Sequence, residues 1–286
     1  MPIQIMSLSV PDFSQVKVLV AGDLMLDEYW FGPTSRISPE APVPVVRVTR
    51  NESRAGGAAN VAVNLASLGA DTVCAGVVGK DAQGEALRSL LASKGINPVV
   101  SESAERPTIT KLRVLSRNQQ LIRLDTEQRY DVEEADLVAG VLKKNIKDID
   151  VCILSDYAKG TLSEAQQLIA MCRDAGTPVL VDPKGTDFTR YRGATLLTPN
   201  LGEFEAVVGA VLDDESLIVR ADALRADLDL DALVVTLSER GMLVVQKDAE
   251  PEIMPARARE VFDVSGAGDT VIAALAVSIG AGLPYA

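Results

Sequence analysis

The chain has 286 residues, of which 47% are hydrophobic and 24% charged, a composition typical of a globular protein long enough for one large α/β domain with an appendage. Its 28 lysines and arginines against 40 aspartates and glutamates give a formal net charge of −12, which disfavours nucleic acids and anionic membrane surfaces as partners. It contains no histidine, which excludes Ser-His-Asp hydrolysis, Cys-His chemistry and His-ligated zinc and leaves acid–base chemistry to carboxylates, lysines or tyrosines.

The cysteines and the amino-terminal segment indicate in which cellular compartment the protein is expected. Cys74, Cys152 and Cys172 lie far apart in apolar surroundings, which is typical of reduced core thiols and predicts a cytoplasmic location. The N-terminal segment has no basic region followed by a long apolar stretch, so no secretory signal is expected. No run of 18 apolar residues occurs, so no transmembrane helix is expected either.

Short apolar runs alternate with amphipathic segments of helical length along most of the chain. We expect strands at 16–22, 71–79, 150–155, 178–183, 195–200, 232–238 and 242–246. We expect helices near 58–68, 82–94, 163–175, 201–209 and 216–226, and from about Gly268. This alternation predicts an α/β fold in which helices cover both faces of a mainly parallel sheet, an αβα sandwich.

Two stretches interrupt this alternation. Residues 30–50 are crowded with proline, and residues 108–125 alternate on both sides of a polar turn at 117–120, the pattern of a β-hairpin. Neither stretch can form a helical layer, so together they predict a small β-sheet lid over one end of the main sheet. The remaining segments, 1–29, 51–107 and 126–286, are then the α/β core.

The most informative segment is 263–270, Asp-Val-Ser-Gly-Ala-Gly-Asp-Thr, which precedes an apolar helical run. Glycines at such a strand-to-helix junction let the backbone N–H groups of Gly266, Ala267 and Gly268 converge on one point, where the helix dipole also favours negative charge. Asp269 would lie at the mouth of this anion site, within reach of a nucleophile that attacks a phosphoryl group. The alternative is a tight turn in which Asp269 only caps the helix.

This segment resembles the D-T-x-G-A-G-D signature of the ribokinase-like (pfkB) carbohydrate kinases, with Val264 in place of threonine. Three further segments resemble motifs of that family: 54–62 its glycine-rich signature, 198–203 its N-x-x-E element, and 235–241 its T-x-G-x-x-G turn, with Ser238 where glycine is usual. The resemblance spans residues 16–282. It implies a ribokinase-like fold and an enzyme that transfers the γ-phosphate of ATP to a carbohydrate.

The resemblance also implies residue roles. Asp269 would be the general base, and the amides of Gly266, Ala267 and Gly268 would stabilise the transferred group. The paired glycines of the second signature would let the sugar approach the backbone. The alternative is that they serve close packing, and that the aspartates after the first strand are ordinary helix or turn caps. The implied sugar ligands are Asp23, Asp27, Gly56, Gly57 and Asn60.

On the nucleotide side, the family pattern implies that an amide and a carboxylate organise Mg²⁺ through its bound water, because magnesium retains several waters. The implied nucleotide-binding residues are Lys184, Asn200, Glu203, Thr236, Ser238 and Gly241, of which Asn200 and Glu203 would serve the metal. A monovalent-cation site near Asp263 and a homodimer formed through the lid are further implications.

The lid also bears on the acceptor. Four segments look like the heptose kinases of lipopolysaccharide-core synthesis, namely 36–46, 110–114, 119–125 and 155–160. This likeness implies phosphorylation of O1 of D-glycero-β-D-manno-heptose 7-phosphate. Lys111 and Arg113 share one face of the expected hairpin and Arg123 lies on the return strand, so cations gather where a sugar phosphate could bind. Alternatively, these are solvated charges that discourage edge-to-edge aggregation.

Other interpretations stay open. The acceptor could be a different sugar, a sugar phosphate such as fructose 1- or 6-phosphate, or a nucleoside. A dinucleotide-binding oxidoreductase would need G-x-G-x-x-G after the first strand, where the sequence is Ala21-Gly22-Asp23. A non-catalytic sugar sensor would not need Asp269 and its glycines. The absence of G-x-x-x-x-G-K-[ST] excludes a P-loop kinase.

Two expectations concern the end of the chain. In bifunctional heptose kinases a nucleotidyltransferase domain with a histidine motif follows, so this histidine-free chain is expected to be a stand-alone kinase. Family members also continue through another helix that helps to wall the adenine pocket, so either the sequence is truncated or its nucleotide site is incomplete.

Overall fold

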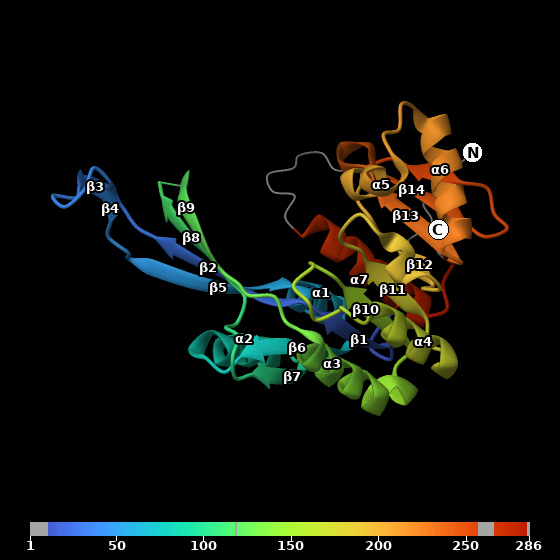
Figure 1. Ribbon diagram of the computed structural model, residues 1–286, viewed down its shortest axis with the longest axis horizontal. Coiled ribbons are helices and arrows are strands. Elements are labelled where there is room, and N and C mark those ends of the chain that lie inside the picture. The colour runs from blue at the N-terminus through green and yellow to red at the C-terminus, as the bar shows by residue number, and fades with distance from the viewer. Residues whose placement is uncertain (1–10, 118, 257–265, 285–286) are drawn as a thin grey trace, which may run out of the picture.

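The computed structural model of the chain describes residues 11–117, 119–256 and 266–284. Its centre is a nine-stranded sheet with the strand order β15-β14-β13-β12-β11-β10-β1-β6-β7 (Figure 1). Neighbouring strands from β13 to β7 run parallel, whereas β14 and β15 form an antiparallel edge. The strands are β1 (Lys17–Gly22), β6 (Asp71–Gly79), β7 (Asn97–Ser103), β10 (Val151–Ser155), β11 (Val179–Asp182), β12 (Leu196–Leu197), β13 (Ala232–Thr236), β14 (Met242–Gln246) and β15 (Glu252–Met254).

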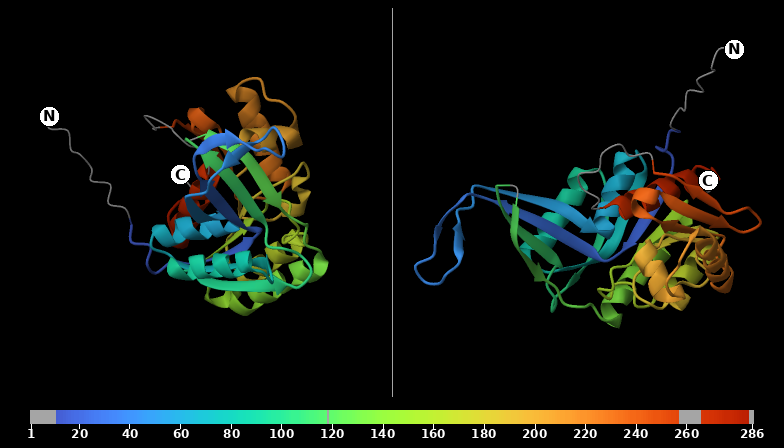
Figure 2. Two further views of the ribbon diagram at one scale, coloured as in Figure 1. Left: turned by 90° about the vertical axis from the view of Figure 1, so that its left-hand side faces the viewer. Right: turned by 90° about the horizontal axis from the view of Figure 1, so that it is seen from above.

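Helices cover both faces of this sheet (Figure 1, Figure 2). Alternate side chains of β1 point to opposite faces of the sheet and pack into two separate hydrophobic cores. Val18 and Val20 belong to one core, and Leu19 and Ala21 belong to the other. The first core is closed by α1 (Ala58–Ser67), α2 (Ala82–Ser93) and α7 (Ala267–Gly280). The second is closed by α3 (Val132–Asn145), α4 (Ala165–Ala175), α5 (Leu201–Val208) and α6 (Asp214–Asp227). Short 3₁₀ turns lie at Ile146–Asp148, Phe188–Tyr191 and Ser238–Arg240.

A second, four-stranded sheet with the order β5-β2-β8-β9 projects from one end of the core as the lid (Figure 1, Figure 2). At its far end β3 and β4 form a small hairpin of their own. The lid strands are β2 (Leu24–Phe31), β3 (Thr34–Ile37), β4 (Pro44–Val46), β5 (Arg50–Gly57), β8 (Thr110–Ser116) and β9 (Gln119–Thr126). The lid is joined directly to the core, because a single residue, Asp23, separates β1 from β2.

The expected fold class, a mainly parallel sheet between helices with a small β lid, is confirmed. The expected division between core and lid differs from the structure at β2 and β5, because the lid also takes residues 24–29 and 51–57, which the sequence pattern assigns to the core. The reason is that the first core strand runs on into the lid after a one-residue break. The strand β7 and the helix α3 were not expected from the sequence. Among the described helices, none combines the length and apolar character needed to cross a membrane.

Candidate active site

A cavity of about 590 Å³ is lined by residues of the lid, α1 and α7. Figure 1 shows these elements next to one another at the base of the lid. The walls of the cavity come from β2, β5 and β8 of the lid, from the start of α1, from the end of α2 and from the start of α7. The structure gathers eight sequence-predicted residues around it: Asp27, Gly56, Gly57, Asn60, Lys111, Arg113, Gly266 and Asp269. Side chains from the two glycine-rich segments therefore face one space, although 209 positions separate Asn60 from Asp269.

Asp269 lies in the first turn of α7, and only 7% of its surface is exposed. Its Oδ2 accepts a hydrogen bond of 2.6 Å from Nδ2 of Asn60, and its Oδ1 accepts one of 2.9 Å from the hydroxyl of Tyr157. Burial raises the pKa of Asp269, these two hydrogen bonds oppose the rise, and the charge of Asp27 adds to it. The result is a positioned carboxylate with an increased affinity for a proton.

Gly266 shapes the start of α7. Its φ of 77° lies in the left-handed region, and a Cβ there would lie 2.8 Å from Nδ2 of Asn60. The first N–H groups of a helix have no acceptor within the helix, so the backbone around Ala267 and Gly268 offers the positive end of α7 to the cavity. The rest of the expected motif, including Asp263 and the monovalent-cation site predicted near it, lies outside the described residues.

The other glycine pair ends β5 immediately before α1. Gly57 has φ 57° and ψ −139°, a combination that residues with a side chain avoid, and a Cβ there would lie 2.4 Å from the carbonyl oxygen of Asp23. A Cβ on Gly56 would lie 2.6 Å from Oδ2 of Asp27. The backbone therefore requires glycine at position 57, while Gly56 leaves room for the carboxylate of Asp27. Asn60 follows on the first turn of α1, where it reaches Asp269.

Asp23 does not fit the expectation that it binds a sugar hydroxyl. Its side chain is fully buried, and its carboxylate accepts hydrogen bonds from the backbone N–H groups of Tyr157, Lys159 and Thr161 at 2.8, 2.9 and 3.1 Å. These donors occupy both oxygens, so Asp23 holds the loop after β10, and it does not line the cavity. Of the two predicted aspartates, only Asp27 lines the cavity.

Two of the three predicted lid cations line the cavity, and the third does not. Arg113 lines the cavity, and its Nη1 lies 2.6 Å from Oδ1 of Asp27. Lys111 also lines the cavity, 3.7 Å from a carboxylate oxygen of Asp125. Arg123 is not part of the cavity wall. Its guanidinium pairs with Asp125 at 2.9 Å on an exposed strand, so the structure does not bring it to the site.

The predicted nucleotide residues form a separate group at the carboxyl ends of β11 and β13. Asn200 and Glu203 make a reciprocal capping box at the start of α5, and Nζ of Lys184 lies 2.7 Å from Oε1 of Glu203. An isolated bridge joins Asn200 to Thr236 at the end of β13. The turn that follows has Ser238 at φ 55° and Gly241 at φ 101°. The left-handed φ at position 238 explains why glycine suits this position better than serine.

The donor atoms near Glu203 suit a hard cation. Next to this group, burial raises the pKa of Asp182 well above its usual value, and the negative charges of Asp269 and Glu203 add to the rise. Carboxylate and amide oxygens are the ligands that Mg²⁺ prefers, and this ion needs only one or two of them because it retains water. Within the described parts of the chain, no cluster of three or more His, Cys, Asp or Glu side chains forms a dedicated metal cage.

Several residues of the site are not predicted by the sequence motifs. Tyr157 donates to Asp269, and the ring of Tyr29 lies between two guanidinium groups, 4.6 Å from that of Arg54 and 5.2 Å from that of Arg113. Lys94, at the end of α2, lines the same cavity. Tyr29 and Lys94 lie outside the four motifs, and the likeness of segment 155–160 to heptose kinases assigns no role to Tyr157. Each joins the site through contacts between segments that are distant in the sequence.

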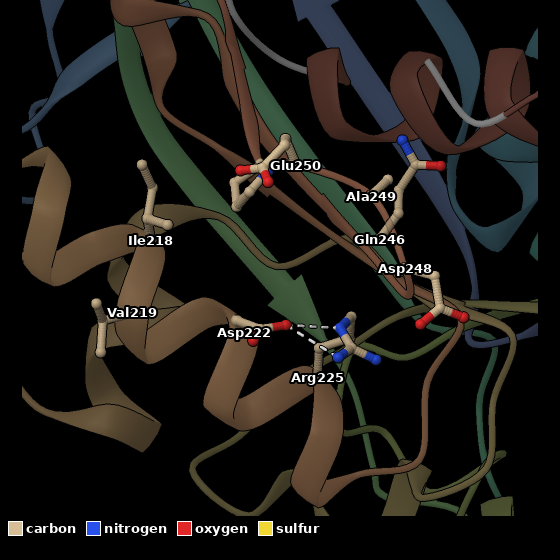
Figure 3. Close-up of a pocket in the computed structure, with 9 residues that line it drawn as sticks. Ile218, Val219, Asp222, Arg225, Gln246, Asp248, Ala249 and Glu250 are labelled. Carbon is tan, nitrogen blue, oxygen red and sulfur yellow. Dashed lines mark hydrogen bonds and ion pairs between the residues drawn. The ribbon is translucent and has the colours of Figure 1, made fainter.

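A second cavity, of about 580 Å³, lies between α6 and the turn from β14 to β15 (Figure 3). Arg225 and Asp222 form an ion pair of 2.9 Å beside it. Gln246 pairs with Ala232 at the start of β13, so this cavity lies at the opposite edge of the sheet from Thr236. It contains none of the sequence-predicted site residues.

Comparison with known proteins identifies the family. The sequence profile of the pfkB family carbohydrate kinases matches residues 16–286. The chain belongs to this family. It is therefore a carbohydrate kinase, and the expected family and enzyme class are confirmed.

Curated relatives are similar over almost the whole chain. The "Bifunctional protein HldE" of Alcanivorax borkumensis is 57% identical over 274 residues, which are 96% of this chain and 57% of the relative. The protein of the same name from Shewanella amazonensis is 54% identical over 283 residues, 98% of this chain and 60% of the relative. This carbohydrate kinase thus spans about three fifths of the length of these relatives.

Solved structures support the fold. The tetrameric inhibited form of phosphofructokinase-2 from Escherichia coli has a TM-score of 0.77 at 21% identity and covers 94% of this chain and 89% of its own. Arabidopsis thaliana ribokinase complexed with ribose and ATP has a TM-score of 0.72 at 22% identity, with coverages of 94% and 87%. These likenesses confirm the ribokinase-like fold of the carbohydrate kinase.

Proposed function

We propose that this carbohydrate kinase uses ATP to phosphorylate O1 of D-glycero-β-D-manno-heptose 7-phosphate, giving the 1,7-bisphosphate for ADP-heptose synthesis in lipopolysaccharide-core assembly. The observation that carries the proposal is the position of Asp269, a buried carboxylate at the start of α7 that faces a cavity rich in cations. The heptose acceptor rests on the likeness of the lid segments to heptose kinases and is supported by the strong similarity to the HldE proteins.

The charge of the cavity favours an anionic acceptor. Its wall contains four basic side chains, Arg54, Lys94, Lys111 and Arg113, and three acidic ones, Asp27, Glu52 and Asp269. This local balance contrasts with the net charge of −12 for the whole chain. Guanidinium groups bind phosphate through paired hydrogen bonds, so we assign the sugar phosphate to the side formed by Arg54 and Arg113. Arg54, and not Arg123, is thus the second arginine of the proposed phosphate site.

The proposed reaction is an in-line transfer. Asp269 accepts the proton of the O1 hydroxyl while that oxygen bonds to the γ-phosphorus and the bond from this phosphorus to the β–γ bridging oxygen breaks, releasing ADP. The amides of Gly266, Ala267 and Gly268 stabilise the negative charge of the transferring group. Asn60 orients Asp269 through the 2.6 Å hydrogen bond, and Asp27 and the glycines beside it hold the sugar.

ATP would lie along the group formed by Lys184, Asn200, Glu203, Thr236, Ser238 and Gly241. Asn200 and Glu203 are the residues that would hold Mg²⁺, directly or through water, and the metal would supply positive charge to the phosphates. Lys184 neutralises Glu203 at 2.7 Å and can also turn to a phosphate oxygen, because its side chain is 47% exposed. A cytoplasmic location is part of the proposal, supported by the three buried free cysteines Cys74, Cys152 and Cys172.

We also propose that two copies pair through their lids. All eight residues of β9 are exposed at the edge of the lid sheet, and Leu121, Ile122 and Leu124 expose 41%, 50% and 50% of their surfaces. An exposed apolar edge strand is a surface that a second sheet can cover.

An acceptor panel tests the function. Purified protein with ATP and Mg²⁺ is assayed for ADP release with heptose 7-phosphate, unphosphorylated heptose, fructose 6-phosphate, ribose and a nucleoside. We expect kcat/KM for heptose 7-phosphate to exceed that for the unphosphorylated acceptors by about 10² or more, because these lack the phosphate that Arg54 and Arg113 would bind. It should also exceed that for fructose 6-phosphate, whose sugar ring places its hydroxyl differently with respect to Asp269. A higher kcat/KM with another acceptor would reassign the substrate, and inactivity with all of them would favour a non-catalytic sugar sensor.

A further inference from the structure

Tyr157 contacts the carboxylate on which the chemistry depends. Its hydroxyl donates a 2.9 Å hydrogen bond to Oδ1 of Asp269, while Asn60 donates to Oδ2, so each carboxylate oxygen has its own donor. Two donors on two oxygens fix the plane of the carboxylate, whereas one would leave it free to turn about χ2. Tyr157 also lines the cavity, so its hydroxyl lies beside the space for the acceptor.

The loop that carries Tyr157 is itself held firmly. The backbone N–H of Tyr157 donates to the fully buried carboxylate of Asp23 at 2.8 Å, and two further N–H groups of the loop bind the same carboxylate. Ala158 adopts a left-handed φ of 59°, and its N–H donates to Asp156 at 2.7 Å. Gly160 approaches the backbone of Tyr130 so closely that a Cβ there would lie 2.1 Å from its carbonyl oxygen. Such a loop is a rigid support for a hydroxyl.

We infer that Tyr157 is a positioning residue for phosphoryl transfer: anchored through Asp23, it orients Asp269 and stabilises its ionised form before the acceptor binds. This inference rests on the proposed role of Asp269 as the base. Tyr157 keeps its own proton throughout, because burial and the charge of Asp269 raise the pKa of its hydroxyl. The proton of the acceptor hydroxyl therefore passes to Asp269 and is not transferred on to Tyr157.

The other charges around Asp269 act in the opposite direction. Asp27 of β2 faces it across the cavity, and Asp182 at the end of β11 interacts with both Asp269 and Glu203 of α5. The remaining described partner is the neutral Asn60 of α1. The described basic side chains of the cavity, Arg54, Lys94, Lys111 and Arg113, make no ion pair with Asp269, and Arg54 and Arg113 pair with Glu52 and Asp27. The two neutral donors, together with the positive end of α7, therefore favour the ionised carboxylate. Removing one of them should therefore raise the pKa of Asp269.

The test is the Tyr157→Phe variant, with Tyr191→Phe as its matched control. Tyr191 is a fully buried tyrosine whose hydroxyl donates to the carboxylate of Asp156 at 2.7 Å and also bonds to the backbone of Lys184, so the control removes a tyrosine–carboxylate bond without touching Asp269. For Tyr157→Phe we expect the acid limb of the kcat/KM profile to move up by about one pH unit, and kcat to fall more than KM changes. For Tyr191→Phe we expect lower thermal stability and an unmoved acid limb.

Two further measurements separate this inference from the proposed function. Titration of the Asp269 carboxyl carbon by ¹³C NMR, assigned with Asp269→Asn, should show the same upward shift in Tyr157→Phe whether or not heptose 7-phosphate is the acceptor. If Tyr157→Phe does not fold, 3-fluorotyrosine at position 157 keeps the ring, makes the hydroxyl a stronger donor and should lower the pKa of Asp269. If the pKa of Asp269 is the same as in the wild type in Tyr157→Phe, or in the 3-fluorotyrosine protein, the inference is overturned. If these pKa shifts occur but the wild type does not phosphorylate heptose 7-phosphate, only the proposed acceptor is overturned.

Discussion

At the scale of single residues, the site depends on how Asp269 is surrounded. Sequence motifs predicted this carboxylate and the asparagine that binds it, because both belong to short glycine-rich patterns. They did not predict the role of Tyr157, which lies 112 residues away from Asp269, because the likeness of segment 155–160 to heptose kinases does not indicate which side chain it contacts. They also misplaced Asp23, since its position after β1 suits a ligand-binding residue and a loop anchor equally well, and only its buried contacts distinguish the two.

Replacing Asp269 by asparagine tests the base itself. The amide of the Asp269→Asn variant could still bond to Asn60 or Tyr157 but could not take up the proton of the acceptor hydroxyl, so kcat should fall by about 10² or more while the fold and the KM for ATP stay nearly the same. Steady-state kinetics and circular dichroism measure these quantities. In the wild type, activity should be lost as the pH falls through the pKa of Asp269, which burial raises above its usual value. Near-normal turnover of the variant would remove Asp269 from the mechanism.

At the scale of elements, most core strands and helices could be predicted because each repeats a simple apolar pattern. The lid was harder, since β5 carries a polar sequence, Arg-Asn-Glu-Ser-Arg-Ala-Gly-Gly, in which six of eight residues are at least partly exposed. Such a strand forms because β2 pairs with it along its full length, from Leu24 with Gly57 to Phe31 with Arg50. The strand conformation of β5 therefore comes from its pairing with β2 and not from a local apolar pattern.

The loop of residues 156–161 gives a prediction at this scale. Asp23→Ala would leave three backbone N–H groups without their acceptor, so we expect the free energy of unfolding to fall by about 3 kcal/mol or more, as measured by urea denaturation. Asp71→Ala, at an exposed aspartate at the start of β6, should change it by less than about 0.5 kcal/mol. Equal effects of the two substitutions would show that Asp23 does not hold the loop.

At the scale of the whole molecule, the sequence of one chain says least about what covers the lid. Its outer strand β9 is exposed along its whole length, which is unusual for a strand with three apolar side chains, Leu121, Ile122 and Leu124. The proposed pairing of two lids would cover these side chains. Whether an edge is covered depends on a second molecule, which no pattern within one chain encodes directly.

Sedimentation velocity tests the proposed homodimer. The wild type should sediment as a dimer of the 30.3 kDa chain, and Leu124→Lys, which places a charge in the apolar part of β9, should shift it to monomer at micromolar concentration. Leu212→Lys is the control, because Leu212 is 92% exposed in the segment before α6, far along the chain from the lid. A monomeric wild type, or a variant that remains dimeric, would contradict pairing through β9.

The one-residue connection at Asp23 couples parts of the protein that have different tasks. Its carbonyl oxygen accepts the N–H of Ala58 at 3.0 Å where α1 begins, while its carboxylate carries the backbone of Tyr157. A tilt of the lid that twists β2 would therefore turn the same residue that supports the tyrosine. The lid that encloses the sugar and the tyrosine that orients the base therefore share one anchor, so a change at Asp23 should disturb both.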